Sequence, residues 1–145
     1  MPYATVDDLV EELSEEVTLE LTDDADTGTL ADPAVQAICS DALGDASALI
    51  DSYAGAQYVV PLAPVPAIVN KYGTLIAAYY LYLRRGVVPA AVQAAYDNAV
   101  SWLKDLAKGT VVIGETDEQP VLQTPGARAI VAGPQVFTRE RLLTY

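Results

Sequence analysis

The stretch from Pro66 to Gly86 constrains the fold of this chain more than any other. Its apolar residues recur at spacings of three and four along two overlapping stripes, which is the pattern of an amphipathic helix. Because both apolar stripes must be buried away from water, we expect other helices to contact this one on two sides, which places it in the middle of a bundle. The first stripe is Ile68, Tyr72, Leu75, Ile76, Tyr79 and Leu83; the second is Val69, Tyr72, Ile76, Tyr80 and Leu83.

The ends of this helix carry matching signals. Pro66 suits the first helical turn, where its missing N–H costs nothing, and Gly86 suits the position just past the last residue. Two arginines fall in the last turn, where the helix dipole favours cations. The length would also suit a membrane span, but Asn70, Lys71 and four tyrosines argue against one.

Two short helices are predicted before it. Thr5 with Asp8 three residues later predicts a capping box at the start of the first. A break is expected near Ser14, followed by a second short helix over residues 15–21.

Two longer helices are predicted on either side of the central one. Asp32 and Pro33 suit the start of a helix that Gly55 ends, and an apolar stripe runs through its whole length. Pro89 and Gly109 bound the last helical stripe in the same way.

Residues 56–65 connect the first long helix to the central one. Pro61 and Pro64 each fix φ and push the preceding residue toward an extended conformation. We therefore expect an ordered, extended strap that Tyr58 and Leu62 pin to the core. A proline-rich ligand for another protein is the alternative, and the apolar residues around the prolines favour core packing.

The helical stripes stop at Gly109, which divides the chain into a helical bundle over residues 1–109 and a C-terminal segment over 110–145. Two apolar runs rich in β-branched residues flank a polar, proline-bearing stretch in this segment. The segment either packs on its own bundle or reaches a neighbouring subunit. The predicted fold is mainly α: a bundle of four to five helices with a small C-terminal β hairpin or arm.

Charge is divided unevenly along the chain. Residues 1–70 contain fourteen acids and no lysine or arginine, whereas residues 71–145 contain eight lysines and arginines and six acids. These parts carry −14 and +2, which gives the net charge of −12. A solvated acidic face explains this, and so does a surface that avoids nucleic acid or binds a basic partner. The basic footprint of a nucleic-acid-binding protein is absent.

Residues suited to catalysis are scarce. The chain has no histidine, which removes the commonest general base and metal ligand. Its one cysteine, Cys39, falls on an apolar helix face, so we expect a buried, unreactive thiol. Neither a nucleophile elbow nor a glycine-rich phosphate loop is present. We therefore expect neither an enzyme nor a cofactor-binding protein.

Residues 23–31 match part of a calcium-binding loop, with Asp23 at its first position and Gly28 at its sixth. Ala25 and Ala34 stand at the third and twelfth positions, where carboxylates are required. We therefore expect an aspartate-rich turn that leads into a helix cap, and no metal site.

Several short motifs, taken in order, resemble one known family. The most specific is the strap, Asp51-x-Tyr53 followed by Tyr58-x-x-Pro61-Leu62-x-Pro64-x-Pro66. The others are Tyr3-Ala4-Thr5 with Asp8-Leu9, Leu21-Thr22-Asp23 with Gly28, Trp102-Leu103-Lys104 before Lys108-Gly109, and Phe137-Thr138-Arg139. Together they resemble the small virion-associated family of Mu-type phages and prophages over nearly the whole chain. Gln57, where a basic residue is expected, and residues 114–126 depart from the pattern.

The resemblance implies a structural virion protein, a head–tail connector similar to the adaptor proteins that form a ring beneath the portal in long-tailed phages. Its expected partners are the portal protein, tail-side connector or terminator proteins, and copies of itself in a ring, expected to be a dodecamer. Double-stranded DNA would pass through without specific binding, and no membrane is involved. The expected place is the virion neck, after synthesis in the cytoplasm of the host bacterium. The alternative is an acidic DNA mimic or regulator that binds a basic partner.

A connector must let DNA pass without gripping it, and basic side chains bind the DNA backbone tightly. We therefore expect part of the acidic half to face the channel or an exposed rim, with Asp41 and Asp45 as candidates. The C-terminal segment would contact a neighbouring subunit or the portal. Its candidate residues are Phe137, which supplies apolar area, and Arg139 and Arg141, which supply hydrogen bonds to carboxylates.

Overall fold

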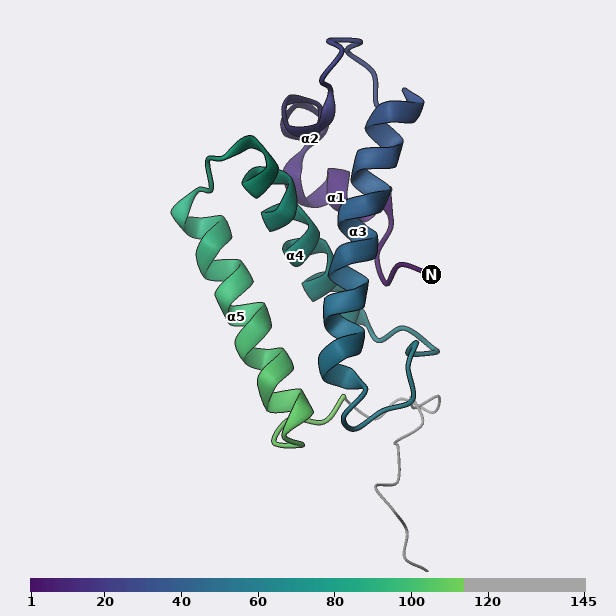
Figure 1. The fold of residues 1–145 in the computed structure, drawn as a ribbon, viewed down its shortest axis with the longest axis vertical. Coiled ribbons are helices and arrows are strands. Elements are labelled where there is room, and N and C mark those ends of the chain that lie inside the picture. Colours follow the sequence, from purple (N-terminus) through teal and green to yellow (C-terminus); the bar gives the residue numbers. More distant parts are fainter. Residues whose placement is uncertain (114–145) are drawn as a thin grey trace, which may run out of the picture.

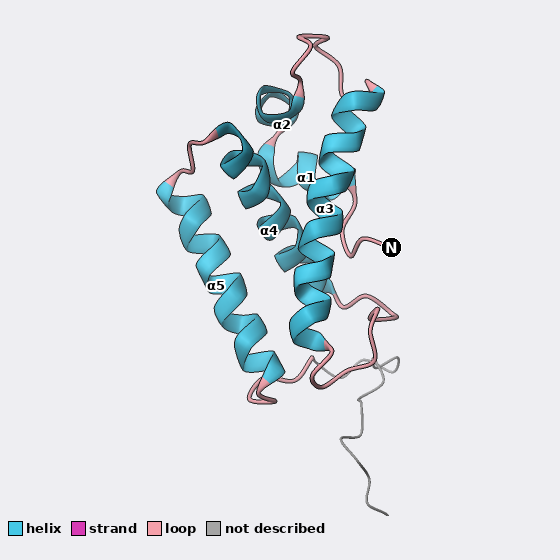
Figure 2. Cartoon of the chain, viewed as in Figure 1, coloured by secondary structure: helices cyan, strands magenta, loops and turns pink. Residues whose placement is uncertain are grey.

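The structure, a computed structural model, describes residues 1–113. Five α-helices follow one another in this range, and each of the three long ones runs antiparallel to the long helix next to it in the sequence (Figure 1; Figure 2). The prediction of a mainly helical bundle is therefore confirmed for this part of the chain. All but the first four residues of the predicted hairpin or arm lie outside the described range. The helices are α1 (Val6–Leu13), α2 (Glu15–Thr22), α3 (Pro33–Ala54), α4 (Ala67–Arg85) and α5 (Ala90–Ala107).

Helices α3 and α4 each contact all four other helices, and α4 has the larger contacts with α1, α2 and α5, so it lies at the centre of the bundle as its two apolar stripes predict. It ends as predicted at Gly86, which adopts a left-handed conformation with φ of 79°. Across residues 1–113, none of the helices combines the length and the hydrophobicity that crossing a membrane requires.

The predicted stripes are wrong for part of α4. Ile68 and Leu83 belong to them but are 40% and 52% exposed. The fully covered side carries mostly small residues, which let neighbouring helices approach the backbone closely. The stripes emphasise large apolar side chains and therefore miss a face whose packing depends on small ones. The buried residues of α4 are Val69, Gly73, Thr74, Ile76, Ala77, Ala78 and Leu81.

Helices α1 and α2 are separated by one residue, Ser14, as predicted. Thr5 and Asp8 form the predicted capping box: the Thr5 N–H donates to the Asp8 carboxylate at 2.7 Å, and the Asp8 N–H donates to Thr5 Oγ1 at 3.2 Å. Asn70 Nδ2 donates to the same carboxylate at 3.0 Å and ties α1 to α4. The Thr5 N–H and Asn70 lower the pKa of Asp8.

Helix α3 begins as predicted, because the Asp32 carboxylate accepts from the Ala34 N–H at 2.7 Å and Pro33 is the first helical residue. Cys39 is completely buried, which confirms the prediction of a buried thiol. Burial raises the pKa of this thiol. Its reactive thiolate form is thereby disfavoured.

The strap, residues 56–65, packs on the core at its two predicted anchors. Tyr58 and Leu62 are 3% and 2% exposed. The Tyr3 hydroxyl holds the strap in place, because it donates to the Asp51 carboxylate on α3 and accepts from the Leu62 N–H at 2.8 Å. This network joins three segments that lie far apart in the sequence, and no sequence pattern predicted it.

The chain returns to the strap after α5. Gln57 Nε2 donates to the Ala107 carbonyl at 3.1 Å, and the Ile113 N–H donates to the Tyr58 hydroxyl at 3.0 Å. Ile113 is buried, although residues 110–113 have no regular secondary structure. These contacts close this end of the bundle.

Candidate functional site

A hollow of about 250 Å³ between α3 and α4 contains both acids that the sequence singled out. Asp41 and Asp45 lie four residues apart on α3, and both are exposed at its edge. Helix α4 supplies the opposite wall. We call this the acidic hollow; it is lined by Ile38, Asp41, Ala42, Asp45, Tyr80, Leu81 and Arg84.

The inner surface of the acidic hollow is apolar. Leu81 and Ala42 are buried, and Ile38 is half-buried. A charged edge therefore surrounds an apolar base. Such a surface suits a partner that combines an apolar side chain with cations.

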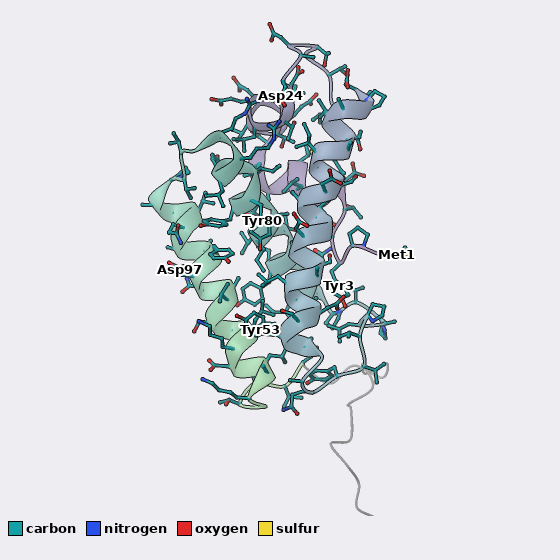
Figure 3. All side chains as sticks on the ribbon, viewed as in Figure 1. Met1, Tyr3, Asp24, Tyr53, Tyr80 and Asp97 are labelled. Atoms are coloured by element: carbon teal, nitrogen blue, oxygen red, sulfur yellow. The ribbon has the colours of Figure 1, made fainter. Side chains whose placement is uncertain are left out.

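Tyrosines continue this wall toward α5. Tyr79 stacks on Tyr96 of α5 with ring centroids 4.0 Å apart, and the Tyr80 ring lies 6.2 Å from the same Tyr96 ring. Figure 3 shows Tyr80 between α3 and α5. Burial, followed by Tyr96 and by the charge of Asp45, raises the pKa of Tyr80 to about 12. Tyr80 therefore remains a neutral hydrogen-bond donor near Asp45 even in alkaline solution.

Arg84 lines the acidic hollow, but its charge is engaged elsewhere. Its guanidinium donates to the Leu21 carbonyl at the end of α2 at 3.1 Å and pairs with Asp24. The hydrogen bond from Arg84 lowers the pKa of Asp24. Among residues 1–113, no cation pairs with Asp41 or Asp45. The edge of the hollow is therefore negative.

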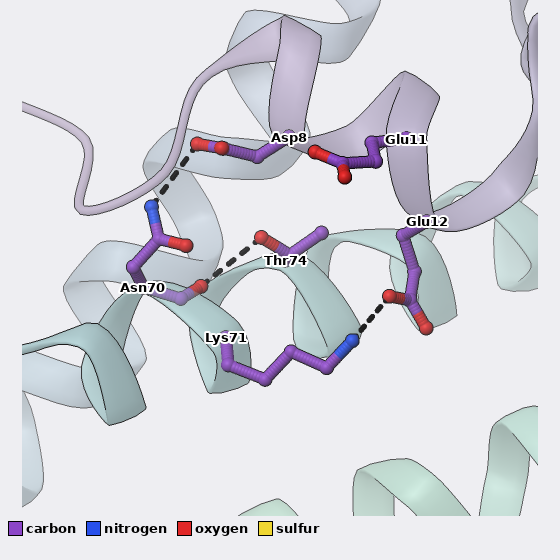
Figure 4. A pocket seen from close by; sticks show the side chains of 6 residues that line it. All are labelled: Asp8, Glu11, Glu12, Asn70, Lys71 and Thr74. Atoms are coloured by element: carbon purple, nitrogen blue, oxygen red, sulfur yellow. Dashed lines mark hydrogen bonds and ion pairs between the residues drawn. The ribbon is translucent and has the colours of Figure 1, made fainter.

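A second hollow, of about 380 Å³, lies between α1 and α4 (Figure 4). Most of its polar side chains already have partners: Lys71 pairs with Glu12, and Asn70 donates to Asp8. The Thr74 hydroxyl donates to the Asn70 carbonyl at 3.0 Å. These contacts join α1 to α4, so this hollow is better explained by helix packing than by a ligand.

The loop over residues 23–31 forms the predicted aspartate-rich turn. Its Asp23 carboxylate accepts from the Gly28 N–H at 2.7 Å and from the Thr27 hydroxyl at 3.2 Å. Within residues 1–113, no three histidine, cysteine or acidic side chains gather as they would around a metal ion.

Of the residues that the sequence singled out, the structure brings Asp41 and Asp45 together in one hollow. Phe137, Arg139 and Arg141 lie outside the described residues. The sequence analysis did not predict the tyrosine contacts between α4 and α5 or the contact of Arg84 with α2. The one related signal in the sequence is its nine tyrosines, because tyrosine is favoured at interfaces.

Comparison with known proteins gives consistent matches. Residues 3–132 match the model of a family described as Bacteriophage Mu, Gp36. The chain is 31% identical over 104 residues to the Mu-like prophage FluMu protein gp36 of Haemophilus influenzae, and the aligned residues are 72% of each chain. It is also 31% identical over 144 residues to gene product J of Escherichia phage Mu, which covers 97% of each chain.

Proposed function

Because the chain belongs to the bacteriophage Mu Gp36 family, we propose that it is a structural virion protein, a head–tail connector of the head-completion or adaptor type. In this proposal it forms a ring, expected to be a dodecamer, between portal and tail in the virion neck, and double-stranded DNA passes through. Its partners are the portal protein, tail-side connector or terminator proteins, and copies of itself. The observation that carries the proposal is the match to the Mu family over nearly the whole chain.

The distribution of charge supports a channel role. Ten of the fourteen acids in residues 1–70 are exposed. The three cations of α4 each pair with an acid from that part of the chain. The surface of α1, α2 and α3 is therefore left strongly negative, and it repels the DNA phosphates instead of binding them.

The proposed role needs no catalysis and no cofactor. The chain lacks histidine, and its one thiol is buried. Asp41 and Asp45 are exposed, as either a channel position or a rim position requires.

The location of the protein in the particle tests this proposal. An epitope-tagged copy expressed in the parent phage should be found in purified virions, and gold labelling should place it at the junction of head and tail. A protein that is absent from virions, or that is spread over the capsid, would contradict the connector role. The alternative, an acidic DNA mimic, predicts a complex with a basic protein in the infected cell and no copy in the particle.

Truncation separates the bundle from the assembly contacts. A chain that ends after Gly126 should melt at nearly the same temperature as the full chain, because residues 3–113 already form a packed hydrophobic core. The same truncation should abolish incorporation into virions. Unfolding of the truncated chain would instead show that the C-terminal segment belongs to the core.

A further inference from the structure

We propose that the acidic hollow binds residues 137–141 of a second copy of this chain. The contact rests on the ring proposed above and deepens it, because it names how one subunit holds the next. Of the two positions that the sequence leaves open for Asp41 and Asp45, it assigns them to a rim and not to the channel.

Charge complementarity supports this contact. Four of the eight cations of the chain pair with acids inside the bundle. Of the other four, one is Lys104 on α5, and the remaining three are Arg128, Arg139 and Arg141. Three of the five arginines of the chain therefore belong to residues 114–145, while the two exposed aspartates of the acidic hollow have no cationic partner within residues 1–113.

The spacing of the charges also matches. Asp41 and Asp45 are four residues apart on a helix, which corresponds to a rise of about 6 Å. Arg139 and Arg141 are two residues apart, which in an extended chain is about 6.6 Å, with both side chains on the same side. An extended segment along α3 therefore sets one arginine opposite each aspartate, where charge-assisted hydrogen bonds form.

Phe137 extends the match to the apolar base. It lies two residues before Arg139, so in an extended chain its side chain points to the same side. On α3, Ile38 lies three residues before Asp41, a rise of about 4.5 Å, and it lines the hollow on that side. Phe137, the only phenylalanine of the chain, would thus bury apolar area on the base of the hollow. This burial matters because exposed ion pairs alone contribute little.

The position of the hollow suits a contact between copies. Ile113, the last described residue, packs beside the strap, which follows the end of α3, whereas the α3 residues that line the hollow, Ile38 to Asp45, lie nearer the start of that helix. Phe137 is twenty-four residues further along the chain, a reach of at most about 86 Å. A segment that leaves one end of a subunit and binds the other end of the next makes a head-to-tail contact, which closes into a ring when the rotation allows.

Charge reversal in the full chain tests the pairing. One variant reverses the hollow, Asp41→Arg with Asp45→Arg, and a second reverses the segment, Arg139→Asp with Arg141→Asp. Sedimentation velocity up to millimolar concentration measures self-association, and circular dichroism checks that each variant is folded. We expect the wild-type chain to associate and each variant alone to stay monomeric, because like charges then face each other across the contact.

Mixing the two variants shows whether the contact joins different copies. In an equal mixture each hollow meets a segment of opposite charge only on the other variant, so association should return to the wild-type level. A chain that carries all four reversals provides a further test. If this chain associates as the wild type does but mixing the two double variants restores no association, the segment binds the hollow of its own copy, which overturns the proposal. A wild-type chain that stays monomeric throughout, or reversed variants that associate normally, also overturns it.

A matched control separates the contact from net charge. Glu16→Arg with Glu20→Arg reverses two exposed acids that are also four residues apart, on α2, and should associate as the wild type does. Failure of this contact and failure of the connector role can be told apart. If mixing the variants restores association but the protein is absent from virions, the contact is supported and the connector role is rejected. If the protein is found at the neck but mixing restores no association, only the contact is rejected.

Discussion

The strap and the acidic hollow belong to opposite ends of one bundle, and only at the strap are the polar groups paired within the bundle. At the strap, the Tyr3 hydroxyl donates to Asp51 and accepts from the Leu62 N–H, and the Tyr58 hydroxyl accepts from the Ile113 N–H. Within residues 1–113, no buried side-chain nitrogen or oxygen lacks a hydrogen-bond partner.

The acidic hollow keeps two exposed carboxylates that no cation of the described residues neutralises. A buried polar group without a hydrogen-bond partner lowers the free energy of unfolding much more than an exposed one does, because water still solvates the exposed group. The strap end therefore contributes stability, whereas the acidic hollow can leave its charges for a partner at little cost to the fold.

The largest effect should come from removing an anchor of the strap. Leu62→Ala should lower the free energy of unfolding by about 2–5 kcal/mol, because it leaves a cavity under the strap. Val59→Ala on the same strap should change it by less than about 0.5 kcal/mol, because Val59 is 48% exposed. Urea unfolding curves compare the two, and equal midpoints would show that the strap is not part of the core.

The next effect concerns the hydrogen bonds of the strap. Tyr3→Phe should cost about 1–3 kcal/mol, because it leaves the buried Leu62 N–H without an acceptor. Tyr82→Phe is the matched control, since the Tyr82 hydroxyl makes no hydrogen bond within the described residues and only a small change is expected. If both variants unfold at the same urea concentration, the Tyr3 network does not stabilise the fold.

Alkaline titration compares the two ends in one experiment. Burial and the hydrogen bond to Asp51 raise the pKa of Tyr3 to about 12, and the pKa of Tyr80 is also about 12. Because the folded state holds these protons more tightly, their contribution to stability is complete below pH 10 and is lost as the pH rises toward 12. Tyrosinate absorbance should therefore show two tyrosines that ionise late.

Two substitutions assign these late steps to their residues. Asp51→Asn should lower the pKa of Tyr3 alone, and Asp45→Asn should lower that of Tyr80 alone, each only in part because burial is the largest cause. If both tyrosines ionise near pH 10 in the wild-type protein, neither is held as the structure indicates.

The smallest effect on stability is expected at the acidic hollow. Asp41→Asn with Asp45→Asn should change the free energy of unfolding by less than about 0.5 kcal/mol, since both side chains are exposed. The same urea experiment measures it. A loss above about 1 kcal/mol would mean that these carboxylates hold the fold together, and the contrast with the strap would disappear.

Sequence spacing predicted the elements of this bundle because its signals are local. The capping box at Thr5 and the turn at Gly86 each depend on neighbours within a few residues. The strap anchors Tyr58 and Leu62 were also predictable, since they are large apolar residues of a proline-bearing stretch, although Val59 and Val65 of the same stretch are exposed.

The sequence by itself therefore determined the helices, the strap and the segregation of charge. The tertiary structure decided which face of α4 is buried, where the Tyr3 hydroxyl bonds, and which wall faces Asp41 and Asp45. Those features depend on residues far apart in the sequence, such as Tyr3 and Leu62 or Asp45 and Tyr80. Their contact follows from how whole helices pack against one another. Small residues such as Gly73 and Ala77 determine that packing, but they do not contribute to the apolar stripes from which a buried face is predicted.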